Sequence, residues 1–186
     1  LQSKGNKLPV SALILNSPFL DMNMSWFMEE VVIPVISFIG NYFPNLEVEG
    51  KGISQYAHSL LKRIHGEWEY NENWKKTTGH PKKAGWIHAI HKGHQTIQKG
   101  LNLTCPILVM SSDKSIPETK IWNELYHTSD IVLDVKDIQK YGKMLGSRVT
   151  CKQIHNGKHD LILSNEPARK ETYQVIFSWL KQQSGK

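Results

Sequence analysis

The spacing of hydrophobic and polar positions changes several times along this chain, and each change predicts a different element. Two runs, ALIL at 12–15 and ILVM at 107–110, contain no polar residue, which is typical of strands buried on both faces of a parallel sheet. The β-rich run at 149–154 predicts a third strand. We therefore expect an α/β fold in which these strands are parallel and share one sheet.

Helical spacing appears between the second and third strands. Asp134 predicts an N-cap, with Asp137 three residues further on, and apolar residues then recur until Gly146 ends the helix. These apolar positions are Ile138, Tyr141 and Leu145. The pattern predicts an amphipathic helix with one face buried.

A last helix is predicted after the third strand. It begins at the sequence Ser164-Asn165-Glu166-Pro167, which combines capping residues with a proline suited to a first helical turn. Its apolar stripe consists of Tyr173, Ile176 and Leu180, with Trp179 beside them. We expect this stripe to dock on the sheet.

The long stretch between the first two strands has a different character. Residues 25–43, SWFMEEVVIPVISFIGNYF, are apolar apart from a few positions, mainly Glu29 and Glu30. Pro34 should kink or divide a helix there, because proline lacks the backbone N–H that a helix interior needs. The segment at 70–79, YNENWKKTTG, has turn composition and should link helices.

An acid and a histidine occur where an α/β fold brings such residues together. Asp130 opens a turn before the helix at Asp134, and Asn156-Gly157 predicts a turn that leaves His159 on a loop just beyond the third strand. The carboxyl ends of parallel strands meet at one edge of the sheet. A carboxylate there would hold the imidazole in one tautomer, so that its other nitrogen could act as a base.

These motifs resemble the last third of an α/β-hydrolase. The sequence DIVLD at 130–134 is followed by a helix, a strand and a Gly-Lys-His corner, with His159 placed 29 residues after Asp130. This arrangement is most similar to the branch of monoglyceride lipases, lysophospholipases and serine aminopeptidases, whose members carry a helical lid. ALILNSPFLD at 12–21 resembles the family's strand after the nucleophile helix, and CPILVMSS at 105–112 its penultimate strand.

The resemblance covers nearly the whole chain and implies a partial α/β-hydrolase fold. The expected architecture is the last three parallel strands with flanking helices and a helical lid insertion at about 20–100. The lid would cover an acyl pocket and touch a lipid surface, or its apolar side chains would simply pack on the core; both alternatives remain open.

One part of the family pattern is missing from this chain. The family's nucleophile lies in a Gly-x-Ser-x-Gly elbow, which does not occur between Leu1 and Lys186, and the oxyanion-hole segment is missing as well. Leu1–Lys7 resembles the tail of a helix, and the strand after it would form an exposed hydrophobic edge, which natural proteins avoid. We expect the chain to be the C-terminal portion, residues 1–186, of a single hydrolase domain whose serine lies outside it.

Two residues compete for the role of the acid. Asp113 follows its strand directly, where the family usually has its acid, but it lies 46 residues before His159. Asp130 follows an excursion that the family pattern lacks, yet the sequence after it fits the family without gaps. We favour Asp130, because Asp134 has a structural role as a helix cap and Asp160, next to His159, is expected to fix the loop.

Composition narrows the possible partners. The net charge is +6 with a pI near 9.2, but the lysines are scattered and lack the interleaved aromatic residues of a nucleic-acid surface. No nucleic-acid partner is therefore expected. No apolar stretch approaches the ~20 residues of a membrane span and no signal peptide opens the chain, so we expect a cytoplasmic protein.

Neither the histidines nor the cysteines predict a metal site or a disulfide. His88, His91 and His94 share a predicted helix, but the outer two would point about 120° apart, and neither a cysteine nor a carboxylate lies within their run. Cys105 and Cys151 open neighbouring strands and are expected to be buried thiols without a nucleophilic role. We expect no cofactor.

The resemblance implies a carboxylic ester hydrolase of the lysophospholipase or monoacylglycerol lipase kind, acting on small or lipid-like esters. A serine outside the chain would attack, His159 would transfer the proton, and Asp130 would stabilise the imidazolium. The alternative is a non-catalytic, hydrolase-like protein that binds a ligand or a partner. The sequence leaves esterase, lipase, lysophospholipase and peptidase activities open.

Overall fold

The structure, a computed structural model, describes residues 10–49, 52 and 54–184. Its contacts divide the described residues into two compact units. The first runs to Asp21 and resumes at Ile97, and the second is Met22–Thr96. The helix tail expected at Leu1–Lys7 lies outside the described residues.

The first unit is built on a parallel sheet. Its strands are β1 (Leu13–Asn16), β4 (Ile107–Ser112) and β5 (Val149–Ile154), in the order β1-β4-β5. Both pairings are parallel, with Ile107 in register with Leu13 on one side and with Val149 on the other. The three strands, their direction and the α/β class predicted from the apolar runs are thereby confirmed.

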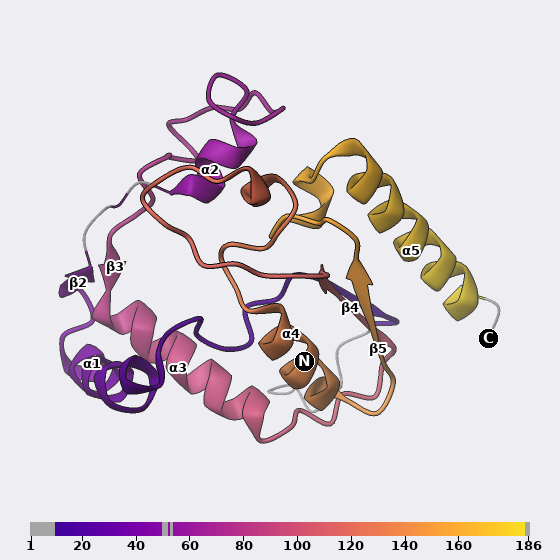
Figure 1. The fold of residues 1–186 in the computed structure, drawn as a ribbon. Helices are drawn as coiled ribbons and strands as arrows, with labels where there is room; N and C mark the ends of the chain where they lie inside the picture. The colour runs from indigo at the N-terminus through magenta and orange to yellow at the C-terminus, as the bar shows by residue number, and fades with distance from the viewer. Residues whose placement is uncertain (1–9, 50–51, 53, 185–186) are drawn as a thin grey trace. The chain divides into compact units, whose positions relative to one another are not determined.

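The surroundings of the central strand, β4, explain why its first four residues are all apolar. All of β4 is buried, since alternate side chains enter two different clusters. Ile107 and Val109 pack with Leu133, Ile138 and Leu145, whereas Leu108 and Met110 pack with Leu161, Ala168 and Trp179. The helices α4 (Val135–Gly142) and α5 (Glu166–Ser184) accordingly lie on opposite sides of the sheet (Figure 1).

Helix α4 begins where its capping residue predicted. The Asp134 side chain accepts a hydrogen bond of 2.9 Å from the backbone N of Lys136. The helix tightens into a 3₁₀ turn, η4 (Lys143–Leu145), before the chain turns at Gly146. Gly146 lies against the backbone of Leu103, which requires a glycine at this position, because a Cβ there would stand 2.2 Å from the Leu103 oxygen.

Helix α5 docks through a face slightly different from the predicted one. Ala168, Thr172 and Trp179 are buried, and Trp179 Nε1 donates to Thr150 Oγ1 at 3.3 Å. Tyr173, expected in the buried stripe, is exposed and stacks on the exposed Phe177. That expectation is wrong because Tyr173 lies about 100° around the helix from Thr172, beyond the edge of the buried stripe.

The second unit is mostly helical, and its first helix is irregular. After one turn at Trp26 and Phe27, the backbone forms a π-helical segment, η2 (Met28–Val32), and then α1 (Ile33–Tyr42). The change of helix type comes immediately before Pro34, which has no N–H to donate to the preceding turn. Pro34 therefore divides the helix into two kinds of turn, as the sequence predicts.

The remaining elements of the second unit are short except for one helix. They are β2 (Glu47–Glu49), α2 (Gln55–Leu60), β3 (Lys82–Lys83) and α3 (Ala84–Gln98), which continues into the first unit by two residues, Ile97 and Gln98. Strands β2 and β3 pair antiparallel. Helix α1 approaches the start of α3 closely, because Gly40 has no side chain and a Cβ there would stand 2.1 Å from the Ala84 oxygen.

Candidate active site

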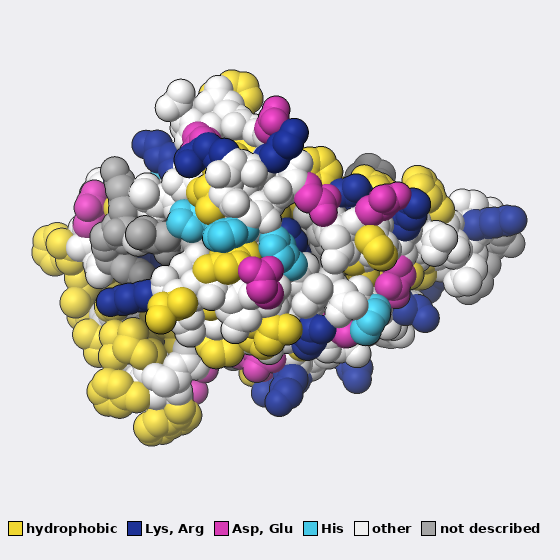
Figure 2. Space-filling model, turned by 45° about the horizontal axis from the view of Figure 1, so that its top comes forward, with side chains coloured by type: hydrophobic (Ala, Val, Ile, Leu, Met, Phe, Trp, Pro, Cys, Tyr) yellow, Lys and Arg dark blue, Asp and Glu magenta, His cyan; other side chains and the backbone are white. Residues whose placement is uncertain are grey.

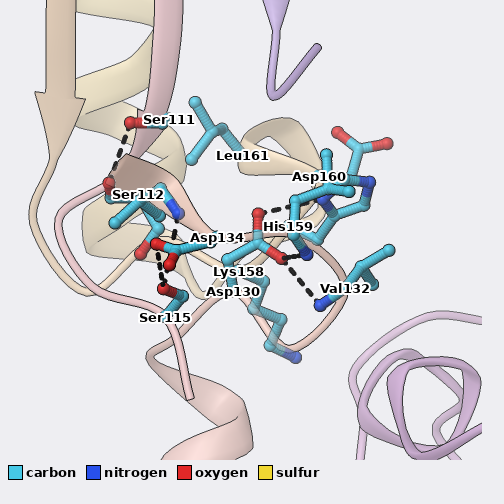
Figure 3. A network of polar contacts seen from close by, with 12 residues as sticks. Ser111, Ser112, Ser115, Asp130, Val132, Asp134, Lys158, His159, Asp160 and Leu161 are labelled. Carbon is cyan, nitrogen blue, oxygen red and sulfur yellow. Dashed lines mark hydrogen bonds and ion pairs between the residues drawn. The ribbon is translucent and has the colours of Figure 1, made fainter. Parts of the chain in front are cut away.

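The residues predicted for catalysis meet beyond the carboxyl ends of β4 and β5. Two loops converge there, the excursion from Asp113 to Asp130 after β4 and the turn from His155 to Asp160 after β5. Figure 3 shows Asp130 and His159 facing each other, joined by one of its dashed lines. Both loops belong to the first unit.

The backbone of Asp130 is fixed by the segment that leaves β4. The Asp130 N donates to the Lys114 oxygen and the Ile116 N donates to the Asp130 oxygen, each at 3.0 Å. These two bonds form a parallel bridge between Ser115 and Asp130. The excursion between them, which includes the 3₁₀ helix η3 (Glu124–His127), therefore returns to the place where it began.

The carboxylate of Asp130 is fully buried and has three hydrogen-bond donors around it. Its Oδ1 accepts from the backbone N of Val132 (2.8 Å) and of Leu133 (2.9 Å). Its Oδ2 lies 2.9 Å from Nδ1 of His159. Burial of a carboxylate is tolerated when donors of this kind replace water, and these donors also fix its orientation.

His159 is held at the corner that the Asn-Gly turn predicted. Asn156 adopts φ 55°, and the backbone N of Lys158 donates to Ser164 Oγ at 2.8 Å. An ionised carboxylate can only accept, so an ionised Asp130 beside this nitrogen favours the tautomer of His159 that carries its proton on Nδ1. The Nε2 nitrogen is then the basic one, on a side chain that is 23% exposed.

The residues after His159 stabilise the corner. Asp160 caps the 3₁₀ helix η5 (Leu161–Leu163) by accepting from the Ile162 N at 3.2 Å. Its Oδ1 also accepts from Asn16 Nδ2 at 2.7 Å. Asp160 thus contacts the loop and the end of β1, in agreement with the structural role expected for it.

The rival acid, Asp113, holds a different histidine. Its Oδ2 accepts from Nδ1 of His155 at 2.9 Å, and its Oδ1 accepts from the backbone N of Asn156 at 3.0 Å. The structure therefore brings together Asp130 and His159, as we favoured, and pairs Asp113 with the start of the same turn. The catalytic roles of Asp130 and His159 stay predictions.

Several polar residues around the pair are missing from the sequence-based prediction. Asn16 links β1 to the His159 corner, and Ser115 Oγ links Asp134 to the backbone N of Val135. Ser17, at φ 44°, and Ser129 have buried hydroxyls that lack a hydrogen-bond partner within the described part of the chain. The Asn-Ser-Pro sequence directly after an apolar run was the available indication for Asn16 and Ser17.

The three histidines of α3 have separate surroundings in the second unit. His88 Nδ1 donates to the Ser37 carbonyl oxygen at 2.8 Å, His91 contacts Gln95, and His94 is buried. Burial, followed by the charge of Lys92, lowers the pKa of His91, which favours its neutral form. Among the residues described, no group of three His, Cys, Asp or Glu side chains could hold a metal ion.

Two further predictions concern the state of the cysteines and the presence of a membrane-spanning helix. Cys105 and Cys151 are free and partly buried, and burial raises the pKa of the Cys151 thiol. Cys105 precedes β4 instead of opening it, whereas Cys151 lies within β5 opposite Val109. Across residues 10–49, 52 and 54–184, no helix is long and apolar enough to cross a membrane.

Comparison with known proteins relates the chain to hydrolases through structure alone. No protein family matches it, and no curated protein is similar to it in sequence. A monoacylglycerol lipase from Paleococcus ferrophilus superposes with a TM-score of 0.63 at 14% identity, over 98% of this chain and 62% of that one. A soluble variant of the Saccharomyces cerevisiae monoglyceride lipase, in complex with a substrate analog, gives 0.59 at 12% identity, over 93% and 56%.

The chain matches only part of each lipase chain. The chain spans about three fifths of the length of each lipase chain, since it covers 62% of one and 56% of the other. At such low identity the likeness concerns the fold. The parallel sheet and its flanking helices thus form part of an α/β-hydrolase fold.

Proposed function

We propose that this chain supplies the acid and the histidine of a serine hydrolase that cleaves carboxylic esters. The observation that carries the proposal is the pair itself: the buried, fully hydrogen-bonded Asp130 carboxylate lies 2.9 Å from Nδ1 of His159. The pair occupies the carboxyl edge of a parallel sheet, the usual place for ligands and catalytic residues in such sheets. The serine belongs to sequence outside this chain.

In the proposed reaction, His159 takes a proton from the serine and then gives it to the leaving alcohol. The serine Oγ attacks the ester carbonyl while Nε2 of His159 takes its proton, and the tetrahedral intermediate then expels the alcohol, which receives that proton. Water repeats the sequence on the acyl-enzyme and releases the acid. Asp130 stays ionised throughout and stabilises the imidazolium through Nδ1.

The proposed substrate class is lipid-like, with a long apolar group beside the ester. Both similar structures are named as lipases of monoacylglycerol or monoglyceride, and one contains a substrate analog. The second unit also exposes large apolar side chains along residues 26–42, which include η2 and α1, and they are visible as the yellow group at the lower left of Figure 2. They include Trp26, Phe27, Val35, Phe38 and Tyr42.

This apolar surface supports an interpretation of residues 20–100 as a lid. Trp26 is 72% exposed and Phe38 67% exposed, whereas helices of a soluble surface usually bury such side chains. We propose that this face contacts acyl chains or a lipid surface when the substrate binds. A basic net charge of +6 would favour contact with anionic lipid.

The proposal is tested in the full-length protein that contains this chain. The DNA preceding the Leu1 codon should encode a strand followed by Gly-x-Ser-x-Gly, and the protein should react covalently with a fluorophosphonate probe through that serine. His159→Ala should abolish the labelling. His127→Ala, which changes a histidine on η3 instead, should leave it unchanged.

The same experiment separates the enzyme from its alternative. A non-catalytic, ligand-binding protein would have no reactive serine, so the probe would leave it unlabelled even when it is folded. Labelling that persists in His159→Ala at equal folded fraction would contradict the proposed role of His159.

A further inference from the structure

We infer that Asp113 is a positioning residue that sets the geometry between Asp130 and His159. The inference rests on the proposed function and assigns a role to the carboxylate that does not contact His159. Its basis is the segment Asp113–Ile116, which leaves the buried strand β4 and contacts the backbone on both sides of the pair.

The first contact is between Asp113 and the turn that carries His159. The two oxygens of Asp113 accept from His155 Nδ1 and from the Asn156 N, at 2.9 and 3.0 Å. In addition, the Asp113 N donates to the Ile154 oxygen at 3.0 Å, and Lys114 Nζ donates to Asn156 Oδ1 at 2.8 Å. Four hydrogen bonds thus fix the start of the turn to the end of β4.

The second contact is between the same segment and Asp130. The Lys114 oxygen and the Ile116 N bond the backbone of Asp130 on its two sides. Ser115, between them, accepts from the Val135 N through its Oγ at 3.3 Å, which ties the start of α4 to the same segment. One short stretch of backbone therefore spans the distance from the acid to the turn of the histidine.

The conformation of the turn explains why it needs such a restraint. Asn156 has φ 55°, a left-handed conformation that L-residues adopt at a cost, which is smaller for asparagine than for most. The Asn156 N is the group that Asp113 holds, and His159 follows three residues later. If this acceptor were lost, rotation about Asn156 would shift the imidazole of His159 relative to the buried Asp130 carboxylate.

The exposure of His155 indicates that the contact serves geometry more than stability. The His155 side chain is 74% exposed, and an ion pair or hydrogen bond this open to water contributes little to folding. A hydrogen bond between catalytic partners is far more sensitive, because a misplacement of about 1 Å can cost ~10²-fold in rate. A large effect on the rate with a small effect on stability is therefore the expected signature.

The test uses graded variants of the full-length protein. Asp113→Ala removes both acceptors, Asp113→Asn keeps one oxygen for the Asn156 N, and His155→Gln removes only the imidazole contact. We expect kcat for an ester to fall by roughly 10–100-fold in Asp113→Ala with KM unchanged, and only a few-fold in the other two variants. Asn165→Ala, which removes the side-chain acceptor for Ala168 at the start of α5, serves as a control for general destabilisation.

A spectroscopic measurement accompanies the kinetics. Nitrogen-15 NMR of histidine-labelled protein reports the tautomer of His159, assigned by comparison with His159→Gln. The Nδ1–H tautomer should dominate in the unmodified protein and in Asn165→Ala, and its share should fall in Asp113→Ala. A merely structural role for Asp113 would lower the melting temperature while leaving the tautomer unchanged.

The outcomes distinguish this inference from the proposed function. If Asp113→Ala leaves both the tautomer and kcat unchanged, the positioning role is wrong, whereas an unmodified protein without esterase activity contradicts the proposed function alone. If Asp113→Asn is as inactive as Asp130→Asn, Asp113 is itself the catalytic acid and the inference is overturned. Should Asp113→Ala fail to fold, Asp113→Asn and His155→Gln, each of which alters the His155 contact, decide by the same tautomer: the Nδ1–H share of His159 should fall in both, and an unchanged share in both overturns the inference.

Discussion

Asn16 Nδ2 donates a hydrogen bond of 2.7 Å to Oδ1 of Asp160, although 144 residues separate them in sequence. The same side chain accepts from the backbone N of Leu161 at 3.2 Å. Asn16 is the last residue of β1, Asp160 follows β5, and β4 lies between these two strands, so the contact links the two outer strands of the sheet at their carboxyl edge. One amide thereby stabilises the loop on which His159 lies.

Replacing Asn16 should therefore weaken this corner. In Asn16→Asp, two carboxylates would face each other and the donor would be lost, so we expect a loss of about 1–3 kcal/mol in the free energy of unfolding at pH 7. Urea unfolding at pH 7 measures it, and an Asn16→Asp protein as stable as the parent would contradict the structural role.

Asp130→Asn in the full-length protein should lower ester turnover severely without unfolding the chain. The asparagine Oδ1 still accepts from Val132 and Leu133, but an amide beside Nδ1 favours the wrong tautomer of His159. We expect a loss of roughly 10³–10⁴-fold in kcat, and roughly 10³–10⁶-fold for His159→Ala. Hydrolysis of p-nitrophenyl esters at equal folded fraction measures both; a loss below tenfold for either would contradict the assigned roles.

The 186-residue chain by itself should not hydrolyse p-nitrophenyl esters above background. The histidine would have no serine to deprotonate, and the lack of oxyanion donors would remove a further ~10²–10³-fold. Turnover that survives His159→Ala in this chain would mean that other residues catalyse it. His88, His91 and His94 would then be the first residues to test.

Gly146→Ala should destabilise the first unit strongly. A Cβ at Gly146 would stand 2.2 Å from the Leu103 oxygen, so the backbone between η4 and β5 would have to move. We expect a loss of about 2–4 kcal/mol in the free energy of unfolding. Gly93→Ala provides the contrast, since nothing lies within 4 Å of the added atom and alanine favours a helix. Thermal melts of both variants check the prediction.

Cys105 and Cys151 should both titrate as thiols in the denatured, unreduced chain. In the native protein, Cys151 should react more slowly with iodoacetamide than an exposed cysteine at pH 8. The raised pKa lowers its thiolate fraction at that pH, and burial limits access. Raising the pH should speed the reaction. Mass spectrometry of timed samples follows each site, and fewer than two free thiols after denaturation would contradict the structure.

The sequence predicted best those features that depend on neighbouring residues. The buried strands appeared as unbroken apolar runs, α4 as a capped periodic segment, and the His159 corner as an Asn-Gly turn, because local backbone preference and burial agree in each case. The choice of Asp130 over Asp113 relied on the resemblance to the hydrolase family, and the catalytic role of Asp130 stays a prediction. The sequence contains no indication of the partner of the second histidine, His155, because that contact depends on how two loops meet in space.

Other features could not be predicted because tertiary contacts decide them. Whether Tyr173 or Thr172 faces the sheet depends on the rotation of α5 by a fraction of a turn, which Trp179 and Ala168 fix by packing. Strand β2 has three residues and β3 has two, and both carry charged residues, so neither strand is long enough to show a periodic pattern. Asn16 contacts a residue at the far end of the chain, and a single sequence contains no indication of that contact.

The bridge between Ser115 and Asp130 makes the excursion between them a closed loop with its own small packing centre. Tyr126 is buried and its hydroxyl accepts from the Thr119 N at 2.8 Å, while Trp122 packs edge-on against its ring. Because the stem holds both ends, the free energy of closing the loop changes only slowly with its length, by about 0.6 kcal/mol for a doubling. Residues 117–129 could therefore be lengthened, shortened or replaced while Asp130 keeps its position.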